Sequence, residues 1–205
     1  LAKCSNDWCF YIQCDEVLHE RDIVPVLKKM EQFEKNDSVE GLLFNYIHFY
    51  GSYDVIARAR NWYRKEVRAV KKNSGIQSWA DAQGFRVNEQ KPKVKESGAS
   101  IYHYGWVKPP QQMGQKKKLL DRLWHGNKKD SENDSFDFKT QYGLQHFKGS
   151  HPSVMMERVR EQNWKFEPKK PVLSWDKKDW NYFASDVLEK VTGHRIGEYK
   201  NYRLI

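Results

Sequence analysis

The chain has 205 residues and a formal net charge of +9, with 31% charged and 14% aromatic residues. This length suits one hydrophobic core with an appendage, and the aromatic side chains supply large buried surfaces. No apolar run approaches the roughly 18 residues of a membrane-spanning helix. The basic residues form short clusters separated by acidic ones, which argues against a continuous nucleic-acid-binding stripe. A solvated surface explains these clusters, and attraction to anionic lipid or to a phosphorylated substrate is the alternative.

The first predicted strand is an aromatic and β-branched run that begins at Trp8 and ends in the carboxylates Asp15 and Glu16. Ligands of open α/β sheets bind beyond the carboxyl ends of the strands. A carboxylate there can hold Mg²⁺ or Mn²⁺ against a phosphate. The alternative is an acidic helix N-cap, in which either carboxylate accepts hydrogen bonds from free backbone N–H groups.

Three cysteines, Cys4, Cys9 and Cys14, crowd this first strand. Their spacing lacks the paired pattern of a zinc site, so we expect buried, reduced thiols in a cytosolic protein. A cytoplasmic location follows, and the basic clusters are compatible with peripheral association at the inner face of a membrane.

Apolar periodicity then predicts an α/β arrangement with helices flanking a sheet. Strands are expected over residues 40–49, 66–70 and 99–104, with a hairpin over 85–96. Helices are expected over residues 23–33, 110–124, 152–162 and 176–192, the last ending at Gly193. Residues 125–139 are rich in Gly, Asn, Asp, Ser and Lys, which predicts a flexible loop that serves as a linker or as a flap.

Three polar groups lie at strand ends or in the loops that follow them. They are centred on Asp15, Asp81 and His103. Together they could hold a cation on a diphosphate and place a general base beside an acceptor hydroxyl. Individually, Asp81 is also compatible with a turn former and His103 with a hydrogen-bonded core histidine.

Four segments read in order carry a family resemblance. They are residues 7–16, residues 40–53, the Asp-Ala-Gln-Gly-Phe motif at 81–85 and the Tyr-His-Tyr-Gly-Trp-Val motif at 102–107. The combination resembles the second half of a bacterial family 2 glycosyltransferase, over roughly residues 5–125. The resemblance implies a partial GT-A fold, in which a mixed α/β sheet binds a nucleotide-diphospho-sugar and the sugar is transferred with inversion.

The resemblance also implies roles for individual residues. Asp15 and His103 would bind Mg²⁺ or Mn²⁺, and Asp81 would be the catalytic base. Gln13 stands where the family has the first Asp of its Asp-x-Asp motif, a departure that puts a two-carboxylate grip in doubt. The remaining expected substrate contacts are Gln13, Glu16, Trp79, Gln83, Trp106 and Lys108.

The resemblance implies a division into residues 1–125, the C-terminal portion of the catalytic domain, residues 126–139, a linker, and residues 140–205, a helical extension. The family's first nucleotide-binding strands would lie upstream of Leu1. The expected partners are a nucleotide-sugar donor and a glycan or other hydroxyl acceptor, in cell-surface polysaccharide or glycan synthesis. A non-catalytic relative that acts as an interaction module is the alternative, and nucleic acid is not an expected partner.

Overall fold

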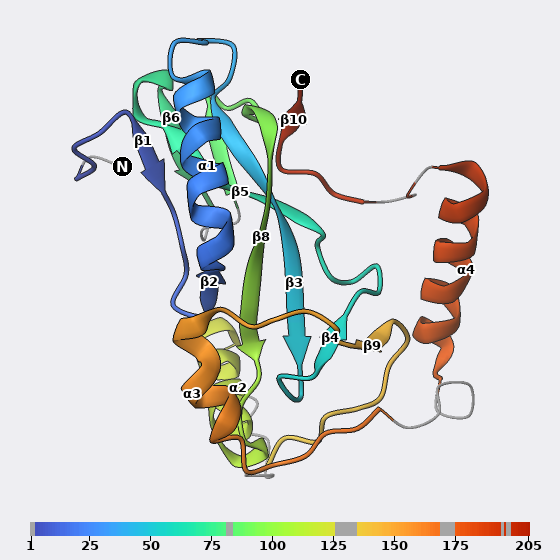
Figure 1. The fold of residues 1–205 in the computed structure, drawn as a ribbon. Helices are drawn as coiled ribbons and strands as arrows, with labels where there is room; N and C mark the ends of the chain where they lie inside the picture. Colours follow the sequence, from blue (N-terminus) through green and yellow to red (C-terminus); the bar gives the residue numbers. More distant parts are fainter. Residues whose placement is uncertain (1–2, 81–83, 126–134, 169–174, 194, 196–197) are drawn as a thin grey trace.

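The computed structural model describes the chain except residues 1–2, 81–83, 126–134, 169–174, 194 and 196–197 (Figure 1). Within this part, a curled mixed sheet of eight strands is accompanied by a two-stranded sheet and four α-helices. The strands are β1 (Trp8–Phe10), β2 (Glu16–Leu18), β3 (Gly41–Tyr50), β4 (Val55–Ala57), β5 (Lys65–Lys71), β6 (Ile76–Trp79), β7 (Gly84–Val87), β8 (Lys93–Trp106), β9 (Leu144–His146) and β10 (Arg203–Leu204). The helices are α1 (Glu20–Phe33), α2 (Pro110–His125), α3 (Met156–Arg160) and α4 (Lys177–Thr192), with short 3₁₀ turns η1 (Lys72–Ser74) and η3 (Ser153–Met155). The expected α/β fold class is confirmed in its general form, a mixed sheet accompanied by helices.

The two longest strands, β3 and β8, form the centre of the large sheet and run parallel to each other. On its other side β3 pairs antiparallel with β5 and, near its end, with β4. β3 is almost entirely apolar and mostly buried, as expected for a central strand. The parallel register sets His48 beside His103, a pairing that determines the centre of the site described below.

The predicted first strand is divided into two short strands. β1 pairs with β5, whereas β2 pairs antiparallel with β8, so the chain crosses from one part of the curled sheet to another between them. The prediction of one buried strand ending at Asp15 is therefore wrong, because Asp15 precedes β2 instead of following a strand. The thiols are also more varied than predicted: Cys9 is buried, but Cys14 is exposed.

The hairpin predicted over residues 85–96 is wrong in its pairing. The turn exists, since Asn88 and Glu89 have φ values of 48° and 65° and a bridge joins Val87 to Gln90. However, β7 pairs with β6, and β8 leaves the turn to lie parallel to β3. Hydrogen bonds to these other strands replace the predicted local ones.

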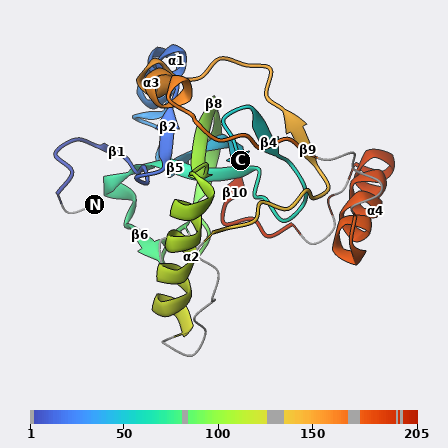
Figure 2. The same cartoon turned by 90° about the horizontal axis from the view of Figure 1, so that it is seen from below.

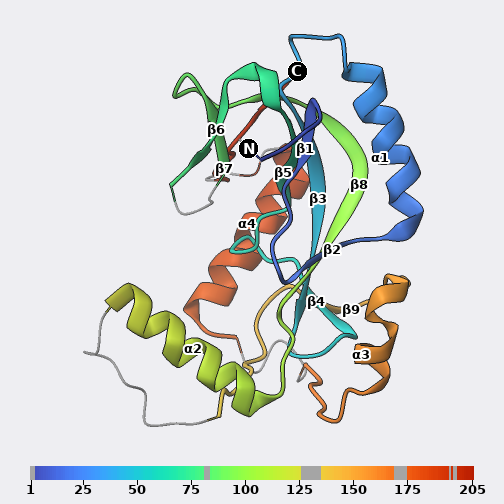
Figure 3. The ribbon, with the colours of Figure 1, turned by 90° about the vertical axis from the view of Figure 1, so that its left-hand side faces the viewer.

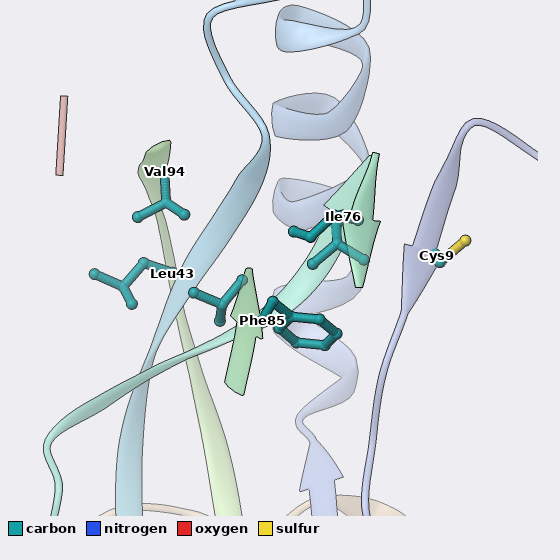
Figure 4. Close-up of a cluster of buried hydrophobic side chains, with 7 residues drawn as sticks. Cys9, Leu43, Ile76, Phe85 and Val94 are labelled. Atoms are coloured by element: carbon teal, nitrogen blue, oxygen red, sulfur yellow. The ribbon is translucent and has the colours of Figure 1, made fainter. Parts of the chain in front are cut away.

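Apolar side chains from the sheet form three clusters. One packs beneath α1, where Val26 joins Leu42, Phe44 and Ile101. Figure 3 shows α1 along one side of the sheet, and β6 and β7 on the opposite side. The second cluster lies between the large sheet and the two-stranded sheet (Figure 4). Its members include Cys9, Leu43, Ile76, Phe85 and Val94. The third surrounds Phe49 and Tyr102 on the side of α3.

The C-terminal region departs from the helical extension that the sequence predicts. β9 pairs with β4, and β10 pairs in parallel with β8, so this region contributes strands to the large sheet. The helix predicted over 152–162 is reduced to η3 followed by the short α3. No helix in the described part of the chain combines the length and hydropathy needed to cross a bilayer.

The helix predicted over 176–192 is confirmed as α4. Asp176 caps it with a capping box to Asp179, and Gly193 ends it at a φ of 70°. Its predicted apolar face is exposed, however, as Trp180, Val187 and Val191 show. Figures 1 and 2 explain this exposure, since α4 stands beyond β9 at the margin of the molecule.

Candidate functional site

The pairing of β2 with β8 brings Asp15 to His103. Glu16 lies opposite His103 in the register, and the Tyr104 amide donates to the Asp15 carbonyl at 2.8 Å. As a result, Asp15 Oδ2 lies 3.8 Å from His103 Nε2. The structure therefore brings together the two residues that the sequence predicted as metal ligands, although Asp15 reaches this place by preceding a strand.

A second histidine fixes the orientation and tautomer of His103. His48 Nε2 lies 2.7 Å from the Tyr63 carbonyl, which only accepts, so this nitrogen carries a proton. In the neutral ring, His48 Nδ1 must then accept, and it lies 3.0 Å from His103 Nδ1. His103 therefore donates from Nδ1, and its Nε2 lone pair is left facing Asp15.

Both imidazoles are buried, which disfavours their charged forms. Burial and the neighbouring His103 lower the pKa of His48 to about 3. Burial also lowers the pKa of His103, although the Asp15 carboxylate opposes this effect. Both rings are consequently neutral near pH 7, so His103 Nε2 is available as a ligand or proton acceptor.

Gly105 leaves space beside this pair. A Cβ atom at this position would lie 2.7 Å from Asp15 Oδ2 and 2.7 Å from His103 Nε2. Any other residue would therefore fill the space that the carboxylate and the imidazole share. This steric requirement gives Gly105 a role in the site that the sequence analysis missed.

Lys116 from α2 brings a positive charge to the same place. Its Nζ donates to the Gly105 carbonyl at 2.8 Å and lies 3.4 Å from Asp15 Oδ2. Figure 2 shows α2 extending from the end of β8. The hydrogen bond to the Gly105 carbonyl places Lys116 beside the last residues of that strand. Lys116 lies in the basic cluster at 116–118, one of the clusters for which the sequence left open a solvated surface or attraction to anionic lipid or a phosphorylated substrate.

The donor set of Asp15 and His103 fits a divalent cation with two protein ligands. The described residues contain no group of three or more His, Cys, Asp or Glu side chains arranged to hold a metal. Mg²⁺ commonly keeps several waters and binds through one or two carboxylates plus substrate phosphates, and Asp15 supplies one carboxylate here. The pair therefore suits a cation that arrives with a phosphate ligand better than a permanently bound metal.

Glu16, predicted to contact a substrate, has a different place. Its side chain is 0% exposed and accepts a bidentate pair of hydrogen bonds from Arg68 at 2.8 and 2.9 Å. Tyr46 Oη and the Gln13 amide also donate to it. Burial alone would raise the pKa of Glu16, but Arg68 outweighs this effect and holds it below its usual range. Its oxygens are therefore engaged within the protein, and Glu16 joins β2 to Arg68 and Tyr46 beneath the Asp15–His103 pair.

The other predicted substrate contacts lie around this centre. Trp106 ends β8 and faces Trp62 and Tyr50, at ring centroid distances of 6.0 and 6.2 Å. Lys108 is half-buried in the bend after β8. Trp79 lies on β6, away from Asp15. The Arg86 guanidinium stacks over its ring in a cation–π contact, 5.0 Å from the ring centroid. Asp81 and Gln83 lie outside the described residues.

The predicted flexible loop borders this aromatic wall. Residues 126–134 lie outside the described residues, but Phe136 and Phe138 are packed. Phe136 faces Trp106 at 6.0 Å and Phe138 faces Tyr50 at 5.4 Å. The end of the predicted loop is therefore part of the packed structure.

Next to the centre is a pocket of about 420 Å³, which we call the tail pocket. Its walls come from Gln13, from residues 60–66 with Arg68, and from the C-terminal residues Arg195 and 198–202. Gln13, two positions before Asp15, and Tyr63, whose carbonyl holds His48, join the pocket to the centre. Burial raises the pKa of the Tyr63 phenol, and the charges of Glu16, Glu66 and Asp15 raise it further.

Comparisons of the chain with protein-family models, with curated proteins and with solved structures find no match. The residues that the sequence analysis missed are His48, Gly105, Lys116, Trp62 and Tyr63. Only His48 had a usable signal, because a histidine inside an apolar central strand needs a buried partner.

Proposed function

We propose that the chain is part of a glycosyltransferase with a GT-A-type fold. The enzyme would transfer a sugar from a nucleotide-diphospho-sugar to an acceptor hydroxyl with inversion, in the synthesis of a cell-surface polysaccharide or other glycan. The observation that carries the proposal is the 3.8 Å approach of Asp15 Oδ2 to a neutral His103 Nε2, beside the space left by Gly105. The motif resemblance at residues 7–16, 40–53, 81–85 and 102–107 supports it.

The pair at the centre would bind the donor through its diphosphate. Asp15 and His103 would hold Mg²⁺ or Mn²⁺, which when bound neutralises the charge that develops on the leaving phosphate. His48 keeps the His103 lone pair directed at this position, in the way that second ligand-sphere groups orient metal-binding histidines. Lys116 adds a positive charge on the same side, where it can contact a phosphate oxygen.

Asp81 is proposed as the general base that takes the proton from the acceptor hydroxyl. The residue lies outside the described residues, but the chain resumes at Gly84 against Asn201 of the tail pocket. Acceptor oxygen and base must approach to about 2.6–3.2 Å in the complex. We expect Asp81→Asn in the full-length enzyme to reduce transfer by about 10²–10⁴-fold with nearly unchanged donor binding. If the variant instead loses donor binding, Asp81 is not the general base and another residue must have that role.

Calorimetric titration with Mn²⁺, with and without a nucleoside diphosphate, tests the metal centre directly. Asp15→Asn and His103→Gln should each abolish binding that the diphosphate strengthens. His146→Gln is the matched control, because His146 is exposed on β9, away from the centre. Equal binding by all variants would contradict the assignment of Asp15 and His103.

The alternative is a non-catalytic relative that acts as an interaction module. One observation favours it: Lys116 already places a cation 3.4 Å from Asp15, so the carboxylate is compensated without a metal. Gln13, in place of the family's first Asp, points the same way. Absence of Mn²⁺ binding even with a nucleoside diphosphate would favour this alternative.

A further inference from the structure

Helix α4 is attached to the rest of the molecule by its polar side. Its three carboxylates, Asp179, Asp186 and Glu189, are spaced seven and three residues apart and so lie on one side of the helix. Asp179 accepts a hydrogen bond from the Tyr142 amide at 2.8 Å, and Asp186 accepts one from the Tyr142 hydroxyl at 3.0 Å. Arg64 donates two hydrogen bonds to Glu189, at 2.7 and 3.1 Å. The acidic side of α4 is therefore turned toward the body of the protein and is engaged there.

The opposite side of α4, which we call the outer face, is apolar. It consists of side chains at positions i, i+7, i+8 and i+11 that are 43–79% exposed: Trp180, Val187, Leu188 and Val191. Trp175, just before the helix, packs against Trp180 with the ring centroids 5.0 Å apart and extends this surface. A surface helix usually buries its apolar stripe and exposes its polar side. α4 does the opposite, at the margin of the molecule where Figures 1 and 2 show it.

The charges beside the outer face are those of lysines. Lys177, Lys178 and Lys190 are exposed, and Lys177 and Lys190 lie next to the apolar stripe near its two ends. The exposed Asp176 is the N-cap and accepts hydrogen bonds from the amides of residues 178 and 179, where the positive end of the helix dipole compensates its charge. The outer face therefore combines exposed apolar side chains with positive charge.

The position of these lysines decides between two occupants of the outer face. A second copy of the chain would bring lysines beside lysines whether the two α4 helices ran parallel or antiparallel, and neighbouring like charges destabilise such a contact. A surface that carries negative charge would instead be attracted. A helix with Trp and aliphatic residues on one face and lysines beside them is typical of helices that lie at the surface of anionic membranes.

We propose that the outer face of α4 binds the surface of an anionic lipid bilayer, with the helix parallel to the membrane plane. Trp180, Val187 and Val191 enter the boundary between the headgroups and the acyl chains, and the lysines contact lipid phosphates. This contact places the peripheral membrane association expected from the basic clusters on a particular helix. It is independent of the proposed glycosyltransferase activity.

Co-sedimentation of the chain with lipid vesicles tests the binding. One set of vesicles is phosphatidylcholine alone, and the other is phosphatidylcholine and phosphatidylglycerol in equal parts. We expect the anionic vesicles to bind the chain about tenfold or more tightly than the neutral ones. Raising the ionic strength should weaken this preference, because salt screens the attraction between lysines and lipid phosphates.

Two variants of α4 assign the binding to the outer face. Val191→Asp should reduce binding to the anionic vesicles by about tenfold or more, since it removes an apolar side chain from the contact and adds a repelled charge. Lys190→Gln should reduce it by about fivefold and leave binding to neutral vesicles nearly unchanged. The matched controls lie on α1, where Val24→Asp and Lys28→Gln change exposed residues of the same types and should bind as the unchanged chain does. Urea unfolding should show equal stability for Val191→Asp and the unchanged chain, because Val191 is exposed.

Three results would overturn the proposal. Equal binding to neutral and anionic vesicles would reject recognition of anionic lipid, and equal binding by Val191→Asp and the unchanged chain would assign the contact to another surface. Failure to bind either kind of vesicle would leave the outer face to a protein partner. Sedimentation velocity without lipid then identifies that partner as a second copy if the chain self-associates and Val191→Asp does not.

Discussion

His48 and His103 lie side by side on the parallel strands β3 and β8, with their Nδ1 atoms 3.0 Å apart. Because the Tyr63 carbonyl fixes the proton on His48 Nε2, this contact determines which nitrogen of His103 is free. The Tyr63 carbonyl, in the wall of the tail pocket, is thereby connected through the His48 ring to His103, the predicted metal ligand.

Replacing His48 with Phe should weaken the proposed metal site without changing either of its proposed ligands, Asp15 and His103. The variant leaves His103 Nδ1 and the Tyr63 carbonyl without their partners, so the His103 ring loses its fixed orientation. We expect Mn²⁺ affinity to fall by about 10–100-fold and stability by about 1–3 kcal/mol. Calorimetry and urea unfolding measure the two effects, with His146→Phe as the exposed control. Unchanged Mn²⁺ affinity would show that His48 only fills space.

Gly105→Ala tests the space beside Asp15 and His103. The added Cβ would lie 2.7 Å from both Asp15 Oδ2 and His103 Nε2, so the two groups must move apart or lose the cation. We expect Mn²⁺ binding in the presence of a nucleoside diphosphate to be lost while the chain still unfolds cooperatively. Retention of full affinity would mean that the cation binds elsewhere.

Lys116→Gln separates two effects of the lysine. Its ammonium repels a free cation at Asp15 but attracts a phosphate bound there. We therefore expect Mn²⁺ alone to bind more tightly to the variant, and the Mn²⁺–nucleoside diphosphate complex to bind more weakly. Lys148→Gln, at an exposed position, should change neither affinity. A parallel change of both affinities would reject a phosphate contact for Lys116.

Glu66→Gln should change the pH dependence of stability. The pKa of Glu66 is raised by burial from 4.5 to about 7, so the folded state retains a proton that the unfolded state releases. This carboxyl therefore destabilises the fold progressively as the pH rises from 4.5 to 7. We expect Glu66→Gln to stabilise the chain by on the order of 2–3 kcal/mol at pH 8 and by little at pH 5. Urea unfolding at both pH values is the measurement, with the exposed Glu157→Gln as control.

The buried histidines have the opposite dependence. Burial lowers the pKa of His48 to about 3, and that of His103 is also lowered, so the unfolded state binds protons first as the pH falls below 6.5. Their contribution to stability is complete above that pH and is lost below it. His48 alone should cost about 2 kcal/mol between pH 6.5 and 5. Comparing the unchanged chain with His48→Phe by urea unfolding isolates this loss, and equal slopes would contradict it.

The pair Asp15–His103 illustrates what the sequence can predict. Both residues stood out as polar groups next to apolar runs, and they do lie together. The predicted cause of this proximity was wrong for Asp15, which does not follow a strand. Asp15 precedes β2 and is positioned by the antiparallel pairing of β2 with β8. Local periodicity identifies a strand but not its partner, and only the partner decides which residues meet.

Long-range pairing also explains the other differences. In the sequence, nothing near Glu16 indicates that it pairs with Arg68 from β5. Likewise, nothing near Arg195 indicates that this C-terminal residue lines the same pocket as Arg68. The apolar stripe of α4 predicted the helix correctly, but periodicity says nothing about whether the stripe finds a surface to cover it.

The parallel alignment of β3 with β8 has a kinetic consequence. Parallel neighbours need a long crossover, and here β4 to β7 lie between the two strands in the chain. Contacts between residues so distant in sequence form slowly, because loop-closure entropy must be overcome before they contribute stability. The histidine pair should therefore appear in one of the late steps of refolding, after β3 and β5 have paired. The time at which the refolding chain gains metal affinity would then measure when β8 pairs with β3, and not when the chain first collapses.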